Sequence, residues 1–359
     1  MSTAVEDRLR SLVHRRPPGI AVAVVGPEGT QVAVGAGHAD LACGLPAAPQ
    51  MVCPWFSMTK IVTATAAMRL ADRGALDLDE PIGPWLPQFT RLRPAESAKR
   101  ITARHLLTHS TGLANPIPIR WIHRPGEPAV DQGAFLDRLL EQNAKLRFEP
   151  GAVSRYSNLG TLSLGVAMAN LTGTSFPELA KNEVLAPLAM HHTAFAYTGQ
   201  LSPQAATGYH PRRSPMRLLL PRWVIGEATG RWISLQPFLL DGQAYGGLVG
   251  SLEDAARFVR MHLRDGELGG EQILKPETAR RMREILVPGR RFDLGLGWFR
   301  RAGHRTDDPP FVEHLGGGAG FFNVIRIYPT RSVGIAVMGN ATTYDIDAVA
   351  ALALTGDIG

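Results

Sequence analysis

Ser57 and Lys60 are separated by two residues, the spacing of a Ser-x-x-Lys motif. They open a stretch, residues 59 to 73, that is apolar on nearly every helical face and is followed by Gly74, a typical C-terminal cap. Side chains three residues apart project from the same face of a helix. A serine is inert at its free pKa, and a lysine in apolar surroundings can be neutral enough to take its proton. The pair therefore indicates a nucleophilic serine, whereas a chance match would leave a helix cap and a solvated lysine.

A second candidate group is Tyr156 with Asn158, which follows the turn Pro150-Gly151 and precedes an expected helix at 159 to 171. A tyrosine acts as a base only if a nearby cation depresses its pKa from about 10, and Lys60 would be that cation. Asn158 can accept a hydrogen bond from the lysine and donate one to a substrate. Its structural alternative is a simple helix cap.

The third group is a glycine-rich run that begins at His314 and Leu315 and continues through Gly316, Gly317 and Gly318. Glycines in a strand let a substrate lie close to the backbone, and a backbone N–H there could complete an oxyanion hole with that of the nucleophile. A plain glycine-rich turn is the structural alternative. A dinucleotide-binding loop is disfavoured because a strand, and not a helix, is expected to follow.

Taken in this order, the three groups resemble the motifs of the serine β-lactamase and penicillin-binding-protein superfamily. The resemblance is to the class C β-lactamase branch, with its carboxylesterase-like and D-aminopeptidase-like relatives, and it extends over roughly residues 15 to 345. The supporting segments are residues 101–113, 148–151, 186–190 and 246–251.

The resemblance implies a role for each position. Ser57 is the acylated nucleophile, and Lys60 and Tyr156 handle its proton. Backbone N–H groups of Ser57 and Gly317 form the oxyanion hole. The substrate-binding and oxyanion positions are Asn158, His314, Gly316 and Gly317.

The third motif departs from that of the β-lactamases in this branch, which carry Lys-Thr-Gly to hold the carboxylate of the drug. His314 is expected to be largely neutral at pH 7, and Leu315 offers no hydroxyl. A carboxylate would lose two polar contacts worth about 1 to 3 kcal/mol each. This departure disfavours efficient β-lactam hydrolysis and recognition of D-Ala-D-Ala.

The segment 216 to 225, with residues 238 to 240, supplies apolar surface that in this family borders the cleft. It can line an acyl pocket or contact a partner or a membrane face, and the sequence leaves both open. We therefore expect a serine hydrolase that acts on esters through a covalent acyl-enzyme, with acyl transfer to another alcohol as an extension. The alternatives are a D-amino-acid-specific peptidase, a weak β-lactamase, and a catalytically inactive scaffold of the same fold.

The periodicity predicts an α+β fold in which one antiparallel β-sheet is flanked by helices and interrupted by a mostly helical lobe, and the family resemblance implies the same fold with an all-helical lobe. The expected parts are residues 1–74 and 236–359, which form the α/β lobe, and residues 75–235, which form the helical lobe. Expected strands are 20–25, 31–34, 294–299, 311–315, 321–328 and 332–338; expected helices are 5–13, 59–73, 102–107, 133–143, 159–171, 176–183, 252–264 and 276–285.

Charge and composition narrow the function classes. The chain has 359 residues and a net charge of +6, but its basic residues are dispersed, so we expect no nucleic-acid partner. The charged N-terminus lacks the apolar core of a signal peptide, and no apolar run approaches the ~20 residues of a membrane span. We therefore expect a soluble cytoplasmic protein without stable membrane insertion.

No metal or organic cofactor is implied by the sequence. His105 and His109 have i, i+4 spacing but lack the acidic base of a His-Glu-x-x-His site, and we interpret them as structural. Cys43 and Cys53 are expected to be free thiols. A small ester or amide is the expected substrate, and the sequence leaves the oligomeric state open.

Overall fold

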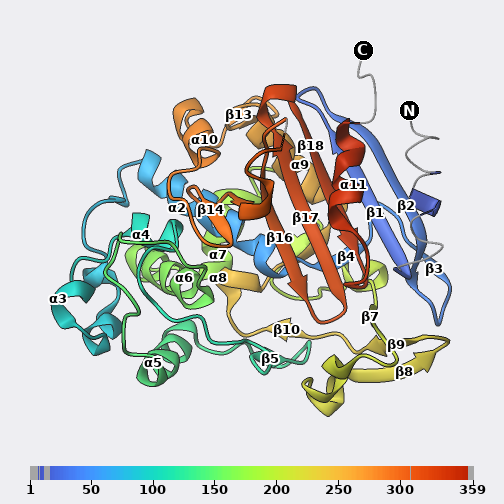
Figure 1. The fold of residues 1–359 in the computed structure, drawn as a ribbon, viewed down its shortest axis with the longest axis horizontal. Coiled ribbons are helices and arrows are strands. Elements are labelled where there is room, and N and C mark those ends of the chain that lie inside the picture. The colour runs from blue at the N-terminus through green and yellow to red at the C-terminus, as the bar shows by residue number, and fades with distance from the viewer. Residues whose placement is uncertain (1–6, 8, 12–16, 308, 355–359) are drawn as a thin grey trace.

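A computed structural model describes residues 7, 9–11, 17–307 and 309–354 (Figure 1). The helix expected at residues 5–13 falls largely outside these ranges. Strands from both ends of the chain form one antiparallel sheet in the order β14-β15-β16-β17-β18-β1-β2-β3, as the sequence predicts. Its strands are β1 (Gly19–Val25), β2 (Thr30–Asp40), β3 (Leu45–Pro46), β14 (Phe292–Leu294), β15 (Phe299–Arg301), β16 (Val312–Gly318), β17 (Phe321–Tyr328) and β18 (Val333–Gly339).

The centre of the sheet joins the two chain ends through the pairing of β1 with β18, in which Val22 lies opposite Val337. Both strands are buried along their whole length. Alternate residues enter two hydrophobic clusters, one under α9 (Leu252–Leu263) and the other under α11 (Ile346–Ala350). Because both faces are covered, β1 and β18 are apolar runs without the alternation of a half-exposed strand.

One expected strand is divided in two. Residues 294–299 were expected to be continuous, but β14 ends at Leu294 and β15 begins at Phe299. The chain turns between them at Gly297, whose φ is +97°. Any Cβ there would lie 2.4 Å from the Cβ of Ala64, so the turn also needs glycine for space.

The helices between the two ends of the sheet surround α2 (Thr59–Asp72) and α6 (Asn158–Thr172), whose buried residues lie on nearly all sides. This explains their lack of a polar face. The remaining helices are α3 (Ala95–Ala98), α4 (Ala103–Leu107), α5 (Gln132–Gln142), α7 (Phe176–Ala180), α8 (Gln243–Gly246) and α10 (Pro276–Met282).

Residues 193–235 depart from the all-helical expectation. They contain β6 (Thr193–Ala194) and a separate sheet of β7 (Gly208–Pro211), β9 (Trp232–Leu235) and β8 (Ile225–Thr229). Gly230, with φ at +59°, forms the turn between β8 and β9. Among the other short strands, β11 (Val249–Ser251) pairs with β4 (Val52–Pro54) on one side and with β6 on the other. The remaining pairs are β5 (Ile122–His123) with β10 (Leu239–Leu240), and β12 (Glu267–Leu268) with β13 (Glu271–Gln272).

None of the helices within the described ranges combines the length and the apolar character needed to cross a bilayer. The boundaries 74/75 and 235/236 between lobes stay predictions.

Candidate active site

Ser57 lies in a short 3-10 turn, η1 (Phe56–Met58), that leads directly into α2. The turn is fixed by the Met58 N–H, which donates to the Trp55 carbonyl at 3.0 Å. Phe56 adopts a left-handed φ of +46°, a strained conformation that is frequent next to functional groups. Lys60 Nζ, one turn further, lies 3.0 Å from Ser57 Oγ. The structure therefore brings the two residues together on one face, as their spacing predicts.

Lys60 is 3% exposed, and burial lowers the pKa of its amine well below the usual range. One N–H donates to the backbone carbonyl of Tyr245 at 2.8 Å. The rings of Tyr156 and Tyr245 lie beside the nitrogen, with centroids at 4.9 and 5.3 Å. Burial thus favours the neutral amine, which is the form whose lone pair can accept the proton of Ser57.

Burial raises the pKa of Tyr156, although a hydrogen bond with Ser57 opposes the shift. The ring packs between His109, at 4.7 Å, and Phe292, at 5.6 Å between centroids. This direction is opposite to the depression of the tyrosine pKa that is expected from a charged Lys60 on the sequence alone, and burial lowers the pKa of that lysine as well. Both shifts favour Tyr156 as a phenol that donates or relays a proton, and its role stays a prediction.

Asn158 begins α6, but the N-cap is Ser157, whose hydroxyl accepts from the Gly160 N–H at 3.0 Å. The helix-cap alternative for Asn158 is therefore wrong. Its backbone N–H donates to Asn115 Oδ1 at 2.9 Å, while its own Oδ1 is buried without a hydrogen-bond partner among the described residues. The recorded hydrogen bonds of Lys60 go to Ser57 and Tyr245, so the expected contact between Asn158 and Lys60 stays a prediction.

Glycines of β16 allow this strand to lie directly against the nucleophile turn. A Cβ on Gly316 would lie 2.1 Å from the Trp55 carbonyl oxygen, and one on Gly318 would lie 2.4 Å from the Phe56 ring. Gly317 lines the same pocket as Ser57. The geometry places the two predicted oxyanion positions at one pocket wall, and their roles as N–H donors stay predictions.

His314 is buried in β16 and does not line that pocket. Its Nδ1 lies 3.0 Å from the Leu315 carbonyl oxygen, so Nδ1 carries the proton, and its ring packs on Phe299 at 4.7 Å. Burial holds the pKa of His314 well below the usual range. The imidazole is therefore neutral, and its direct contact with substrate stays a prediction.

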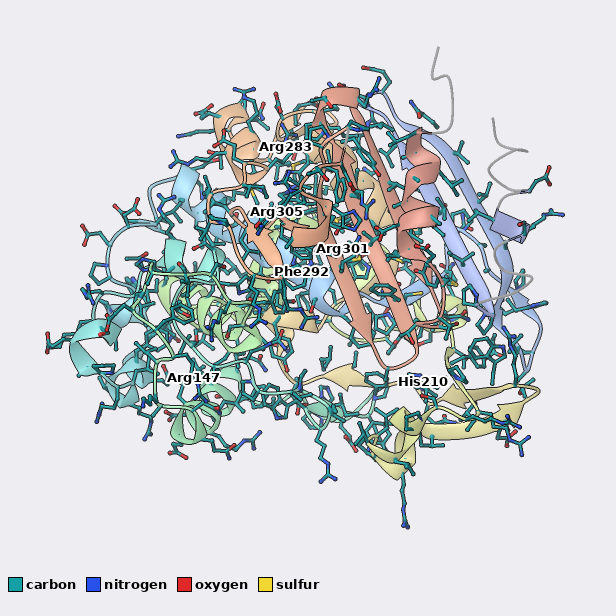
Figure 2. All side chains as sticks on the ribbon, in the orientation of Figure 1. Arg147, His210, Arg283, Phe292, Arg301 and Arg305 are labelled. Atoms are coloured by element: carbon teal, nitrogen blue, oxygen red, sulfur yellow. The ribbon has the colours of Figure 1, made fainter. Side chains whose placement is uncertain are left out.

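A pocket of about 470 Å³ opens beside Ser57, and the end of β16 with the turn that leads to β17 forms part of its wall. The wall is mostly apolar, and in the described chain no Lys, Arg, Asp or Glu lines it. His210, on β7 in the lower right part of Figure 2, also lines the pocket, and its Nε2 has no hydrogen-bond partner among the described residues. The lining residues are Phe56, Ser57, Pro118, Ile119, Ile122, Asn158, His210, Leu220, Phe238, Leu240, Tyr245, Gly246, Gly317, Gly318, Ala319 and Thr342.

Three contributors to the site were missed at the level of sequence. The Tyr245 carbonyl holds Lys60, but a backbone acceptor leaves no signature in the residue type. His109 was interpreted as structural; its Nδ1 accepts from the Ser157 N–H at 3.2 Å and its ring supports Tyr156, so it positions the tyrosine. Burial lowers the pKa of His109 to about 3. His210 reaches the pocket through a strand that the sequence did not indicate.

The described residues hold no group of three His, Cys, Asp or Glu side chains that could bind a metal ion. Cys43 is exposed and Cys53 is buried, and both are free thiols, as expected.

Known protein families and structures resemble this chain in sequence and in fold. A family model described as Beta-lactamase matches residues 5–357. The chain is 28% identical over 366 residues to penicillin-binding protein 4 of Amycolatopsis lactamdurans, covering 95% of this chain and 86% of that protein. Its fold resembles D-amino acid amidase from Ochrobactrum anthropi SV3 (TM-score 0.79, 22% identity, 96% of this chain and 93% of that one). It also resembles EstCE1, a hydrolase with promiscuous acyltransferase activity (TM-score 0.72, 24% identity, 95% and 93%). Because the family model spans nearly the whole chain, this protein belongs to the Beta-lactamase family, within the superfamily of serine β-lactamases and penicillin-binding proteins.

Proposed function

We propose that this member of the serine hydrolase superfamily cleaves esters of apolar acyl groups through a covalent acyl-enzyme on Ser57. The observation that carries the proposal is the apolar pocket beside Ser57, whose described lining includes no residue of fixed charge. An apolar acyl chain gains about 0.8 kcal/mol for each methylene that it buries there. A substrate carboxylate would be desolvated in the same pocket without a cationic partner.

The reaction begins with neutral Lys60 as the base. Ser57 Oγ attacks the ester carbonyl carbon while its proton passes to Lys60 Nζ, which the Tyr245 carbonyl holds in place. The N–H groups of Ser57 and Gly317 face the oxygen on which negative charge develops. The C–O bond to the alcohol then breaks, and the proton returns from Lys60 through the Tyr156 hydroxyl to the departing alkoxide.

Water, or a second alcohol, then attacks the acyl-enzyme and loses its proton by the same route in reverse. When an alcohol attacks in place of water, the acyl group passes from Ser57 to that alcohol and a new ester forms. His109 stays neutral throughout because burial lowers its pKa to about 3, so it supports the Tyr156 ring without taking the proton.

A second candidate substrate is a D-aminoacyl amide. The unpartnered Oδ1 of Asn158 lies at the pocket and can accept a hydrogen bond from an amino or amide N–H. D-amino acid amidase from Ochrobactrum anthropi SV3, which has a similar fold, also supports an amide substrate of this kind. The pocket offers no carboxylate for an ammonium group, which ranks this substrate below a neutral ester.

The test compares p-nitrophenyl butyrate, D-phenylalanine amide and a chromogenic cephalosporin as substrates of the wild type and of Ser57→Ala. Ser202→Ala, which changes an exposed serine, is the matched control. We expect butyrate hydrolysis in the wild type and the control and its loss in Ser57→Ala. Cleavage of the amide without the ester replaces the esterase proposal by the amidase. Absence of labelling by a fluorophosphonate would instead indicate an inactive scaffold.

A further inference from the structure

Exposed apolar surface gathers at the mouth of the active-site pocket. Among the described large apolar side chains, three are at least half exposed: Ile117 at 76%, Leu218 at 78% and Leu219 at 50%. The next most exposed of these side chains is 43% exposed, and its neighbours in the chain do not line the pocket. Ile117 adjoins Pro118 in the chain, and Leu219 adjoins Leu220, and both of these neighbours line the pocket. The most exposed apolar groups therefore flank the entrance to the site.

The two segments that carry these side chains form one surface, which we call the rim and define as residues 117–124 and 212–224. The Arg124 guanidinium lies 5.1 Å from the centroid of the Trp223 ring and so joins the segments. Ile119 from one segment and Leu220 from the other share the pocket wall. In Figure 1, β5 and the sheet of β7, β8 and β9 place the rim along the lower edge of the molecule.

The charge of the rim is positive. The chain has no Asp or Glu between Glu96 and Glu127, or between Glu183 and Glu227, so the rim lacks acidic residues altogether. Its exposed basic residues are Arg120, Arg124, Arg212, Arg213 and Arg222.

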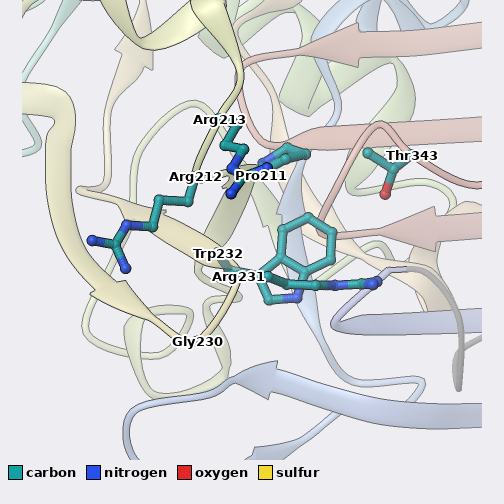
Figure 3. Close-up of a pocket in the computed structure, with 7 residues that line it drawn as sticks. All are labelled: Pro211, Arg212, Arg213, Gly230, Arg231, Trp232 and Thr343. Atoms are coloured by element: carbon teal, nitrogen blue, oxygen red, sulfur yellow. The ribbon is translucent and has the colours of Figure 1, made fainter.

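A basic cleft continues the rim. It measures about 1410 Å³ and is lined by Arg212, Arg213 and Arg231 beside the Trp232 ring (Figure 3). The cleft and the active-site pocket are both lined from β7, since His210 lines the pocket and the next residue, Pro211, lines the cleft. The wall of the catalytic pocket is thus uncharged, whereas the surface around its mouth is cationic.

We propose that the rim docks on an anionic lipid surface, with the active-site pocket opening toward the bilayer. Exposed leucine and isoleucine side chains enter the boundary between headgroups and acyl chains, and arginines bind the lipid phosphates. The positive charge of the rim favours an anionic lipid surface over a second copy of the chain, because two copies would bring one basic rim against another. Docking of this kind is peripheral and needs no membrane-spanning helix.

Sedimentation of the full chain with vesicles tests the docking. Vesicles of phosphatidylcholine mixed with phosphatidylglycerol should bind the protein at least about tenfold more tightly than phosphatidylcholine alone, and added salt should weaken this binding. Equal binding to both kinds of vesicle, or no binding to the anionic one, overturns the proposal.

Two variants assign the binding to the rim. Leu218→Ser with Leu219→Ser should weaken it about tenfold, while Leu286→Ser, which changes an exposed leucine on another surface, should not. Arg213→Glu with Arg222→Glu should weaken it by about tenfold or more, with Arg331→Glu as the control. Wild-type affinity in both rim variants would overturn the assignment.

Hydrolysis of soluble p-nitrophenyl butyrate by the same variants separates docking from catalysis and folding. Since none of the changed side chains lines the pocket, rim variants and controls should hydrolyse it at the wild-type rate. If no protein, wild type included, hydrolyses the ester while the vesicle results hold, the proposed function fails and the docking stands. Circular dichroism checks that each rim variant keeps its secondary structure. If a variant has lost both its secondary structure and vesicle binding, the single change Ile117→Ser replaces it, and this variant must then weaken vesicle binding.

Discussion

The nucleophile region and the rim of the pocket are built in opposite ways. Ser57 and Lys60 lie at the start of a buried helix, and β16 lies so close that its glycines have no room for a side chain. The rim is made of short strands and 3-10 turns, such as η6 (Pro215–Leu218), and it exposes leucine and arginine. The nucleophile region thus lies where water is largely excluded, whereas the rim around the mouth of the pocket is solvated.

This difference indicates that the two regions control different properties. Desolvation in the nucleophile region lowers the pKa of Lys60, and the same desolvation reduces stability because a charged amine is favoured in the unfolded chain. Changes there should alter turnover for every substrate. Changes in the pocket wall should alter which acyl groups are preferred, and changes at the exposed residues of the rim should alter the proposed docking, in both cases with little effect on the chemical step.

The largest expected effect comes from Lys60→Met, which removes the base and keeps the volume of the side chain. Turnover of p-nitrophenyl butyrate should fall about 1,000-fold. Hydrolysis by purified wild type and variant at matched concentration measures this. Turnover within about tenfold of the wild type would show that another group takes the proton of Ser57.

The same substitution should raise the free energy of unfolding at pH 7. Burial lowers the pKa of Lys60 below its unfolded value of about 10.4, so between the two pKa values the unfolded chain binds the extra proton. Stability therefore increases as pH rises through that window, and the wild type is destabilised below it. Lys60→Met removes this pH-dependent penalty, and the loss of the two hydrogen bonds of the lysine, worth about 0.5 to 1.5 kcal/mol each, offsets part of the gain. Urea unfolding at pH 7 and pH 10 should show the gain shrinking at the higher pH.

Tyr156→Phe should lower kcat about 100-fold but preserve the shape of the pH profile. In the wild type, kcat/KM should fall as pH drops through the lowered pKa of Lys60, because the protonated amine cannot accept a proton. Burial keeps Tyr156 protonated, so its removal leaves this acid limb in place. Loss of the limb in Tyr156→Phe would identify a phenolate as the base.

Gly316→Ala tests the close packing of β16 on the nucleophile turn. The new Cβ would lie 2.1 Å from the Trp55 carbonyl oxygen, so either the strand or the turn must move. We expect a loss of about 1 to 3 kcal/mol in unfolding free energy and about tenfold in kcat. Gly303→Ala, where a Cβ meets nothing within 4 Å, is the control and should change stability by under about 0.5 kcal/mol.

The smallest effect is expected in the pocket wall. Wild-type kcat/KM should rise up to about fourfold per methylene of the acyl chain until the pocket is filled. Leu220→Ala should weaken this dependence while acetate esters are cleaved within about twofold of the wild-type rate. Leu219→Ala changes the neighbouring leucine outside the pocket and should preserve the dependence. An identical chain-length profile in Leu220→Ala would place the acyl group elsewhere.

Features that depend on local periodicity were predicted from the sequence. The apolar run that became α2, the strands that became β1 and β18, and the three-residue spacing of Ser57 and Lys60 all follow from side-chain patterns within a few residues. The family resemblance further implied that Tyr156 and the strand at Gly317 meet the nucleophile, and both lie at Ser57. The strands in residues 193–235 were not predicted because they are short and gain their pairing from distant contacts.

By itself, the sequence determined which residues could do chemistry and which segments must be buried, since residue type and periodicity act locally. Only the tertiary structure decided their protonation states. The same lysine would be a cation in water, and its pKa is lowered here because it is buried in α2 beside the rings of Tyr156 and Tyr245. Burial depends on how segments that are distant in the chain pack together. A pKa that is shifted by burial therefore cannot be predicted from the neighbouring residues in the sequence.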